Sequence, residues 1–235
     1  MKVFGITGFK NSGKTTLILR LSRELSQMGF EVGIIKHASG DIDFPDTDTS
    51  KYKSQAPFVC AIASKETEII LRGEKTIEDM LAYVDCDIVL LEGFKQKQTF
   101  PKIVCLRNKS EESELFDGLQ LATASFIEGI SDFHIENDDH IKKLASLVIE
   151  RSFKLPNLNC GHCGYKTCSE LAREIVSGNE TVDRCVSLNP PISVEINGTA
   201  YPLNPFTSNL FKKIIQGMLS SLKGFKKGTI KIEIP

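Results

Sequence analysis

The feature that most constrains this chain is a glycine-rich octapeptide near its start, which reads GFKNSGKT over residues 8–15. Its spacing is that of a phosphate-binding loop: a glycine, four residues, then Gly-Lys-Thr. Glycine allows the backbone to curl so that successive N–H groups point at a phosphate chain. A helix that follows directly adds its positive N-terminal dipole at the same point. The octapeptide therefore predicts a site for the phosphates of a nucleotide.

The sequence on either side of this loop has the elements that the loop requires. Residues 3–7 are apolar and β-branched, as expected of a buried parallel strand. Residues 15–28 place apolar side chains at helical spacing, which predicts an amphipathic helix. Lys14 is expected to reach the β- and γ-phosphates, and the Thr15 hydroxyl is expected to bind Mg²⁺. The other loop residues that we assign to the nucleotide are Gly8, Asn11, Ser12, Gly13 and Thr16.

The composition is that of an ordinary globular protein, with 235 residues, 41% hydrophobic and 25% charged, and a net charge of −1. This charge balance favours neither nucleic acid nor a membrane surface as a partner. The first apolar run spans residues 3–7 and leads into the glycine loop, so it predicts neither a signal peptide nor a membrane span. We therefore expect a cytoplasmic protein.

Residues 1–154 alternate between short apolar runs and stretches of helical periodicity. This alternation predicts an α/β fold of the P-loop NTPase type, with a mostly parallel sheet flanked by helices. The expected strands cover residues 3–7, 30–36, 87–91 and 102–106, and the expected helices cover residues 15–28, 76–84 and 138–150. Two further runs, 58–63 and 68–71, are expected to pair as a hairpin.

Two smaller units are expected to follow, over residues 155–190 and 191–235. The first is bounded by Pro156 and by the Pro190-Pro191 pair, and it contains four cysteines. The second is predicted to be a short α+β tail. It has Asn197-Gly198 between two alternating runs, which is a strong hairpin signal. An amphipathic helix over residues 206–222 and a last strand through Ile230, Ile232 and Ile234 are expected to complete it.

A phosphate loop needs carboxylates that hold the metal ion or its water shell. Asp87 opens the predicted strand 87–91, and Glu92 ends it at the edge where ligands bind in parallel sheets. Either carboxylate could position Mg²⁺ or an attacking water, and each could instead cap the strand end. Asp48 lies in an acidic loop of the kind in which switch-type metal ligands occur. The alternative interpretation is an ordinary solvated loop.

The segment Asn108-Lys109-Ser110-Glu111 follows the strand predicted at 102–106. It is similar to the Asn-Lys-x-Asp motif that reads guanine in many GTPases, with Glu111 in place of the aspartate. A carboxylate at that position can still accept two N–H bonds from guanine. The segment therefore favours GTP over ATP, and its alternative interpretation is an ordinary polar loop.

Four cysteines lie close enough together to share one metal site, with two, four and sixteen residues between them: Cys160, Cys163, Cys168 and Cys185. Four thiolates suit either a tetrahedral zinc or an iron–sulfur cluster. Only the first pair forms a tight Cys-x-x-Cys knuckle, and nearby Gly161 and Gly164 leave backbone amides free to approach cluster sulfides. This favours iron–sulfur over zinc or bare thiols.

The segment after Thr167 has helical periodicity, so Cys168 is expected to open a helix. The three remaining cysteines lie in or beside apolar strands, and we expect them to be buried as small hydrophobic residues: Cys60, Cys86 and Cys105.

About two thirds of the chain, residues 1–150, resembles the MobB family of molybdopterin-guanine dinucleotide biosynthesis adaptors. The resemblance is carried by residues 8–16, Lys36-His37, Asp48-Thr49, the run from Asp87 to Lys95, and the run from Pro101 to Arg107. It implies a dimeric protein that binds GTP with Mg²⁺ and hydrolyses it slowly. It also implies a role beside the guanylyltransferase that joins GMP to molybdopterin, in the maturation of a molybdenum or tungsten cofactor.

Carried over by position, the resemblance assigns Gly13, Lys14 and Thr15 to the phosphates and Mg²⁺, and Asp87 and Glu92 to the metal-side carboxylates. A second resemblance covers residues 158–185. This segment is similar to the four-cysteine domain that binds a four-iron four-sulfur cluster in corrinoid iron–sulfur proteins and in some electron-transport subunits. The resemblance implies such a cluster on these four cysteines.

The leading hypothesis is therefore a GTP-binding adaptor, a weak GTPase at most, with an appended cluster domain. One alternative is a nucleotide-driven metallochaperone or small-molecule kinase, which would need a metal-transfer or acceptor site that the sequence does not reveal. Another is an iron–sulfur electron-transfer module with a vestigial nucleotide site, against which the intact Lys14 and Thr15 argue.

Overall fold

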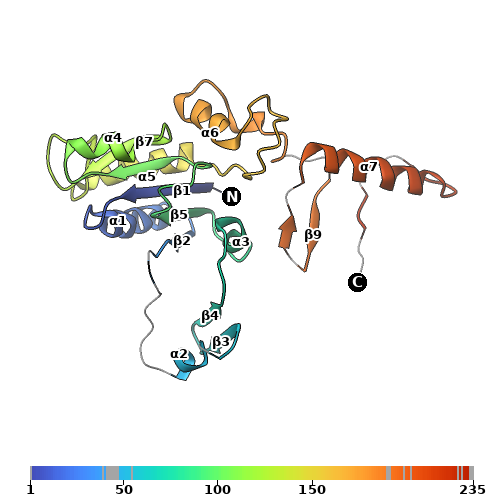
Figure 1. Cartoon of the computed structure of the whole chain (residues 1–235), viewed down its shortest axis with the longest axis horizontal. Helices are drawn as coiled ribbons and strands as arrows, with labels where there is room; N and C mark the ends of the chain where they lie inside the picture. Colours follow the sequence, from blue (N-terminus) through green and yellow to red (C-terminus); the bar gives the residue numbers. More distant parts are fainter. Residues whose placement is uncertain are drawn as a thin grey trace.

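The structure, a computed structural model, describes residues 2–38, 40, 48–53, 55–188, 192–197, 199–201, 203–226, 228 and 230–232. A six-stranded parallel sheet with the order β2-β5-β1-β6-β7-β8 forms its centre (Figure 1). The strands are β1 (Lys2–Gly8), β2 (Val32–Lys36), β5 (Ile88–Glu92), β6 (Lys102–Cys105), β7 (Gln120–Ser125) and β8 (Phe133–His134). The prediction of a mostly parallel sheet flanked by helices is confirmed.

Successive side chains of the central strands point to opposite faces of the sheet, and each face has its own core. Phe4, Ile88 and Leu90 pack under α1 (Lys14–Gln27) and α5 (Asp138–Arg151), which also contact each other. On the other face, Val3, Val89 and Leu91 pack with Ile77 at the start of α3 (Ile77–Leu81). A smaller cluster of Val104, Leu106 and Leu115 lies under η1 (Lys109–Glu111) and α4 (Glu112–Leu115).

An excursion from the sheet contains α2 (Asp48–Lys53) and an antiparallel hairpin of β3 (Phe58–Ile62) and β4 (Thr67–Leu71). The hairpin confirms the pairing expected from the sequence. It lies away from the central sheet, with α2 against β3 (Figure 1). Cys60 of β3 is exposed and Cys86 is half-buried, so their predicted burial is wrong, whereas Cys105 of β6 is buried as predicted. Cys60 lies on the same exposed face of β3 as Phe58 and Ile62.

The four-cysteine unit packs on the nucleotide-binding part of the chain through an apolar cluster. Its helix α6 (Cys168–Ser177) begins at Cys168, as expected, with a capping box between Thr167 and Glu170. Leu171 and Ile175 of α6 pack against Leu119 and Phe153. A short turn, η2 (Val182–Arg184), then returns the chain to Cys185.

The tail contains a hairpin of β9 (Val194–Ile196) and β10 (Thr199–Tyr201), followed by α7 (Pro205–Ser220), which Asn204 caps. Both elements match the sequence-based expectation. The expected last strand is wrong over residues 230–232, which have no strand, and Ile234 lies outside the described residues.

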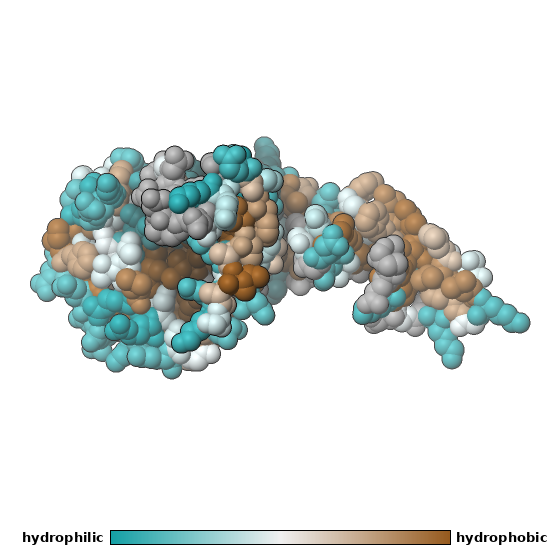
Figure 2. Space-filling view, turned by 90° about the horizontal axis from the view of Figure 1, so that it is seen from below, coloured by the Kyte–Doolittle hydropathy of each residue, from teal (hydrophilic) through white to brown (hydrophobic). Residues whose placement is uncertain are grey.

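Apolar side chains spaced four apart form an exposed stripe along α7, seen as the brown arm in Figure 2: Phe206, Leu210, Ile214 and Met218. No helix in the described part of the chain is long and apolar enough to cross a bilayer.

Lys102 of β6 carries a buried ammonium, with 1% of its surface exposed, close to where the central sheet meets the four-cysteine unit. Its Nζ donates to Asp117 Oδ2 at 2.5 Å and to the carbonyl oxygen of Lys95 at 2.9 Å. Burial lowers the pKa of Lys102, and the hydrogen bond to Asp117 opposes that shift. The neighbouring residue in β1 is Gly5, where an added Cβ would lie 2.7 Å from the Phe100 ring, so a glycine leaves room for this packing.

We expect Asp117→Ala to destabilise the protein by about 3 kcal/mol, because it leaves a buried ammonium without its carboxylate. Lys102→Met removes the charge and keeps most of the volume, so its loss of stability should be smaller. Urea unfolding of both variants measures the difference. Equal losses for the two variants would show that the unpaired charge is not the cause.

Candidate functional site

The phosphate loop joins β1 to α1 at the carboxyl edge of the sheet. Gly8, Asn11 and Gly13 all have positive φ, at 147°, 61° and 90°. At Gly13 an added Cβ would lie 2.6 Å from the Phe126 ring, so the loop needs glycine there for space as well as for conformation. The sequence-predicted curl of the backbone is therefore present.

Three polar side chains in and beside the loop are placed to contact a phosphate: Thr7, Ser12 and Lys14. Lys14 Nζ donates to the carbonyl oxygen of Phe9 at 2.6 Å, and burial lowers the pKa of Lys14. The hydroxyls of Thr7 and Ser12 are buried and have no hydrogen-bond partner within the described residues. Buried polar atoms without partners are costly unless a ligand or water satisfies them. This loop fits a phosphate group.

Glu92 ends β5 beside the loop, and only 8% of its surface is exposed. Its Oε1 accepts a hydrogen bond from Thr15 Oγ1 at 3.3 Å and lies 3.8 Å from Lys36 Nζ. A hydroxyl and a carboxylate side by side at the start of the P-loop helix form a donor set that suits Mg²⁺. The structure brings Thr15 and Glu92 together as the sequence analysis expects.

Asp87 lies away from this site, and the structure does not bring it together with Thr15 and Glu92. It precedes β5 at the edge where Lys2 begins β1, and its Oδ2 accepts a hydrogen bond from the Glu31 N–H at 2.9 Å. Glu92 follows it by five positions along the extended chain, which is about 16 Å. Asp48 begins α2, which packs on β3; its side chain lies outside the described residues.

The segment after β6 lies at the same edge as the loop, but Glu111 has a different role from the expected one. Its two oxygens accept from the Arg107 Nε at 2.6 Å and from the Arg107 backbone N–H at 3.0 Å, and it is 6% exposed. Glu111 therefore holds Arg107 and is not available to read guanine. Asn108 and Lys109 follow at this edge, with the Asn108 Oδ1 accepting from Ser110, and their contact with a base stays a prediction.

Two cations meet on the ring of Phe9, which is part of the loop. The Lys95 Nζ lies 3.8 Å from the ring centroid, and the Arg107 guanidinium carbon lies 5.0 Å from it. Gly93 and Phe94, at φ 89° and 50°, turn the chain after Glu92 and so bring Lys95 back toward the loop. The contact of Lys95 and Arg107 with Phe9 was not predicted from the sequence. The Glu-Gly-Phe-Lys run directly after a buried strand was the sequence feature that could have indicated it.

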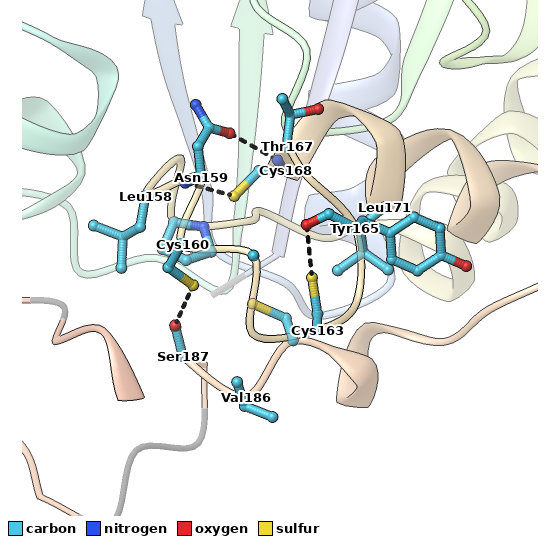
Figure 3. Close-up of a pocket in the computed structure, with 13 residues that line it drawn as sticks. Leu158, Asn159, Cys160, Cys163, Tyr165, Thr167, Cys168, Leu171, Val186 and Ser187 are labelled. Atoms are coloured by element: carbon cyan, nitrogen blue, oxygen red, sulfur yellow. Dashed lines mark hydrogen bonds between the residues drawn. The ribbon is translucent and has the colours of Figure 1, made fainter. Parts of the chain in front are cut away.

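The four cysteines line one pocket, together with Leu158, Tyr165, Leu171 and Val186 (Figure 3). All four are free thiols. Cys160 Sγ lies 3.6 Å from Ser187 Oγ, and the Asn159 N–H donates to Cys168 Sγ at 3.4 Å. Burial acts against ionisation of Cys160, yet hydrogen bonds from His162 and Ser187 lower its pKa overall; burial raises the pKa of Cys185.

The pocket among the thiols has a volume of about 10 Å³, and no group of three or more His, Cys, Asp or Glu side chains among the described residues is spaced for a single metal ion. A four-iron cluster holds its thiolates further apart than a single ion does. The absence of a single-ion spacing in the described part of the chain therefore argues against zinc more than against a cluster. The donor set fits an iron–sulfur cluster by chemistry, provided that the thiols move outward to admit it. Gly161 and Gly164 both adopt positive φ, which gives the ligand loop the turns that it needs.

The strand order, the curled glycine loop and the Thr15–Glu92 pair define a P-loop nucleotide-binding protein, here with a four-cysteine unit attached. The family model "Molybdopterin guanine dinucleotide synthesis protein B", MobB, matches residues 3–126, and the model "Putative Fe-S cluster" matches residues 155–187. The chain belongs to the MobB family.

Individual relatives agree with this assignment. A "Putative molybdopterin-guanine dinucleotide biosynthesis adapter protein" of Methanocaldococcus jannaschii is 32% identical over 243 residues, covering 100% of this chain and 97% of that protein. The molybdopterin-guanine dinucleotide biosynthesis adapter protein of Escherichia coli is 26% identical over 161 residues, covering 63% of this chain and 91% of that protein. The crystal structure of Bacillus subtilis MobB shares the fold, with a TM-score of 0.52, 23% identity and coverage of 65% of this chain and 99% of that chain.

Proposed function

We propose that this protein is a GTP-binding adapter in the synthesis of molybdopterin guanine dinucleotide, with slow GTPase activity. The observation that carries the proposal is the phosphate loop with its Thr15–Glu92 pair, together with the buried Thr7 and Ser12 hydroxyls, for which the described residues supply no hydrogen-bond partner. Family membership supports the pathway, because a relative that matches the whole chain carries the name "Putative molybdopterin-guanine dinucleotide biosynthesis adapter protein".

Each loop residue has a role in this proposal. Lys14 exchanges the Phe9 carbonyl oxygen for the β- and γ-phosphates, and Thr15 Oγ1 binds Mg²⁺. Glu92 orients the water shell of the metal or the attacking water. Lys95 and Arg107, both beside Phe9, add positive charge next to the triphosphate. The intact Lys14, Thr15 and Glu92 argue against a vestigial nucleotide site, and no observation favours a kinase or a metallochaperone.

The four cysteines are proposed to hold a four-iron four-sulfur cluster: Cys160, Cys163, Cys168 and Cys185. Their convergence on one mostly apolar pocket, without disulfides, and the family match over residues 155–187 support this proposal. When bound, such a cluster supplies either a structural cross-link or a one-electron couple. Asn159 and Ser187 contribute hydrogen bonds to the cysteine sulfurs, which tune a cluster's potential.

We further propose that the adapter works in the cytoplasm as a homodimer, beside a molybdopterin guanylyltransferase and a molybdopterin-type cofactor. Exposed apolar side chains on the β3–β4 hairpin support protein–protein contacts in this region: Phe58, Ile62 and Ile69. β2, an end strand of the central sheet, has a further exposed apolar side chain, Ile34.

Lys14→Ala should weaken GTP binding by about 100-fold, because it removes charge-assisted hydrogen bonds to the phosphates. Glu92→Gln should slow hydrolysis by about 100-fold and reduce the dependence of binding on Mg²⁺. Calorimetry with GTP, in the presence and absence of Mg²⁺, and single-turnover hydrolysis measure these effects.

The matched controls are Lys143→Ala, on the exposed side of α5, and Asp87→Asn, at the opposite edge of the sheet. Neither should change binding or hydrolysis. Mg²⁺ dependence that is lost with Asp87→Asn and kept with Glu92→Gln would contradict the metal site described above. Tighter binding of ATP than of GTP would contradict the adapter assignment.

Serine at any of the four pocket cysteines, for example Cys163→Ser, should lower the iron content and the visible absorption of anaerobically purified protein. Cys60→Ser is the matched control, because Cys60 is exposed and lies outside the pocket. It should keep full iron content and colour. A colourless wild-type protein loaded with zinc would exclude the cluster.

A further inference from the structure

A polar cavity of about 290 Å³ lies where the four-cysteine unit meets the nucleotide-binding part of the chain. The start of α3 and the segment 96–99 line one side, and residues between Asn157 and Ser169 line the other. The segment 96–99 follows the turn at Gly93 and Phe94, so the cavity and the nucleotide site share one stretch of chain. Nothing in the proposed function so far uses this cavity.

Three side-chain amides that line the cavity have no hydrogen-bond partner within the described part of the chain: Gln96, Gln98 and Asn157. Each amide offers two donors and one acceptor. Groups of this kind fix the orientation of a ligand and distinguish it from others of similar shape. Gln96 and Asn157 are exposed, so water satisfies them until a ligand displaces it.

The backbone at the wall of the cavity is held in an unusual conformation. Asn157 and Asn159 both adopt left-handed φ, at 57° and 47°, with a single residue between them. The side chain of Asn159 is fixed as well, because its Oδ1 accepts the Cys168 N–H at 2.8 Å. Just before Asn157 in the sequence, the Leu155 N–H donates to the Thr99 carbonyl oxygen at 2.8 Å. This hydrogen bond connects the two sides of the cavity. Non-glycine residues with left-handed φ cluster at ligand sites.

The cavity carries one anionic and one cationic group. Glu78 Oε1 accepts from Lys154 Nζ at 2.6 Å, and no hydrogen bond to Glu78 Oε2 is found among the described residues. Lys97 is exposed and forms no ion pair with any described residue. A carboxylate oxygen and an ammonium at one polar cavity suit a ligand that has N–H groups at one end and an anion at the other.

We propose that this cavity binds a heterocycle that has a 2-amino-4-oxopyrimidine edge and carries a phosphate. The ring N–H and amino group donate to Glu78, the side-chain amides pair with the ring carbonyl and nitrogens, and Lys97 pairs with the phosphate. A phosphorylated pterin and a guanine nucleotide share this chemistry. The volume is close to the lower end of the range for small-molecule pockets, about 300 Å³. This inference rests on the proposed function, in which a pterin phosphate and GMP are joined.

The test uses the full chain, purified anaerobically and saturated with GTP and Mg²⁺ so that the phosphate loop is filled. Neopterin monophosphate, a fluorescent pterin, and GMP are titrated separately. Lys97→Ala should weaken binding of the phosphorylated probe by about tenfold, and should leave unphosphorylated neopterin unaffected. Asn157→Gly keeps the positive φ and removes the amide, and it should weaken both pterins by about fivefold.

Lys166→Ala is the matched control, because Lys166 is an exposed lysine of the same unit that does not line the cavity. Binding of neopterin monophosphate identifies the pterin as the source of the ligand, and binding of GMP alone identifies the nucleotide. Binding of neither probe at millimolar concentration, or equal binding by wild type, Lys97→Ala and Asn157→Gly, would overturn the proposal.

The two proposals fail in different ways. Lys14→Ala should weaken GTP binding by about 100-fold and leave binding of the pterin intact. Loss of the pterin signal with normal GTP binding would overturn the cavity alone, and absence of GTP binding in the wild type would overturn the proposed function.

Discussion

The buried ammonium of Lys102 is the contact on which the arrangement of the whole site depends. A lone charge in this position would be strongly unfavourable, so its partners are fixed. Lys102 binds the Asp117 carboxylate and the Lys95 carbonyl oxygen, and the Asp117 carbonyl oxygen in turn accepts from Arg173 Nε of α6 at 2.8 Å. One cation thereby holds both the segment after Glu92 and the loop on which the four-cysteine unit sits. The carbonyl oxygen that Lys102 binds belongs to Lys95, and the side chain of Lys95 contacts Phe9 in the phosphate loop.

The parallel sheet explains why chemically useful groups gather at one edge. Strands β1, β5 and β6 run in the same direction, so the residues that follow each of them meet at the carboxyl edge. Gly8, Glu92 and Arg107 arrive there from three separate parts of the sequence. Because each strand buries both faces, few of its own side chains are free to take part in chemistry. The site is therefore built from loop residues and strand ends, with Phe9 as the surface on which two cations converge.

Local sequence could predict the parts of this site that a short motif specifies. The phosphate loop, the position of Glu92 at a strand end and the spacing of the cysteines all depend on chain-local geometry. Asp87 precedes its strand, so it lies at the amino end of the parallel sheet and not at the carboxyl edge where the phosphate loop lies. Glu111 lies four residues after Arg107, a spacing that suits an ion pair as well as a guanine contact. The pairing of Lys95 and Arg107 across Phe9 depends on tertiary structure, and alternation at 230–232 predicts a strand without supplying a neighbour for it.

The four-cysteine unit is part of the architecture of the nucleotide-binding region and not a separate appendage. Its apolar side, through Leu171 and Ile175, packs on Leu119 and Phe153, and its polar side completes the cavity over residues 96–99. Asn159 lines both the thiol pocket and the cavity, and its hydrogen bonds to the Cys168 N–H and Sγ connect the two. Any outward movement of the thiols must therefore be accommodated at the cavity wall. A chain that has the MobB fold without this unit would lack one side of the cavity, so the cavity is a property of the combined protein.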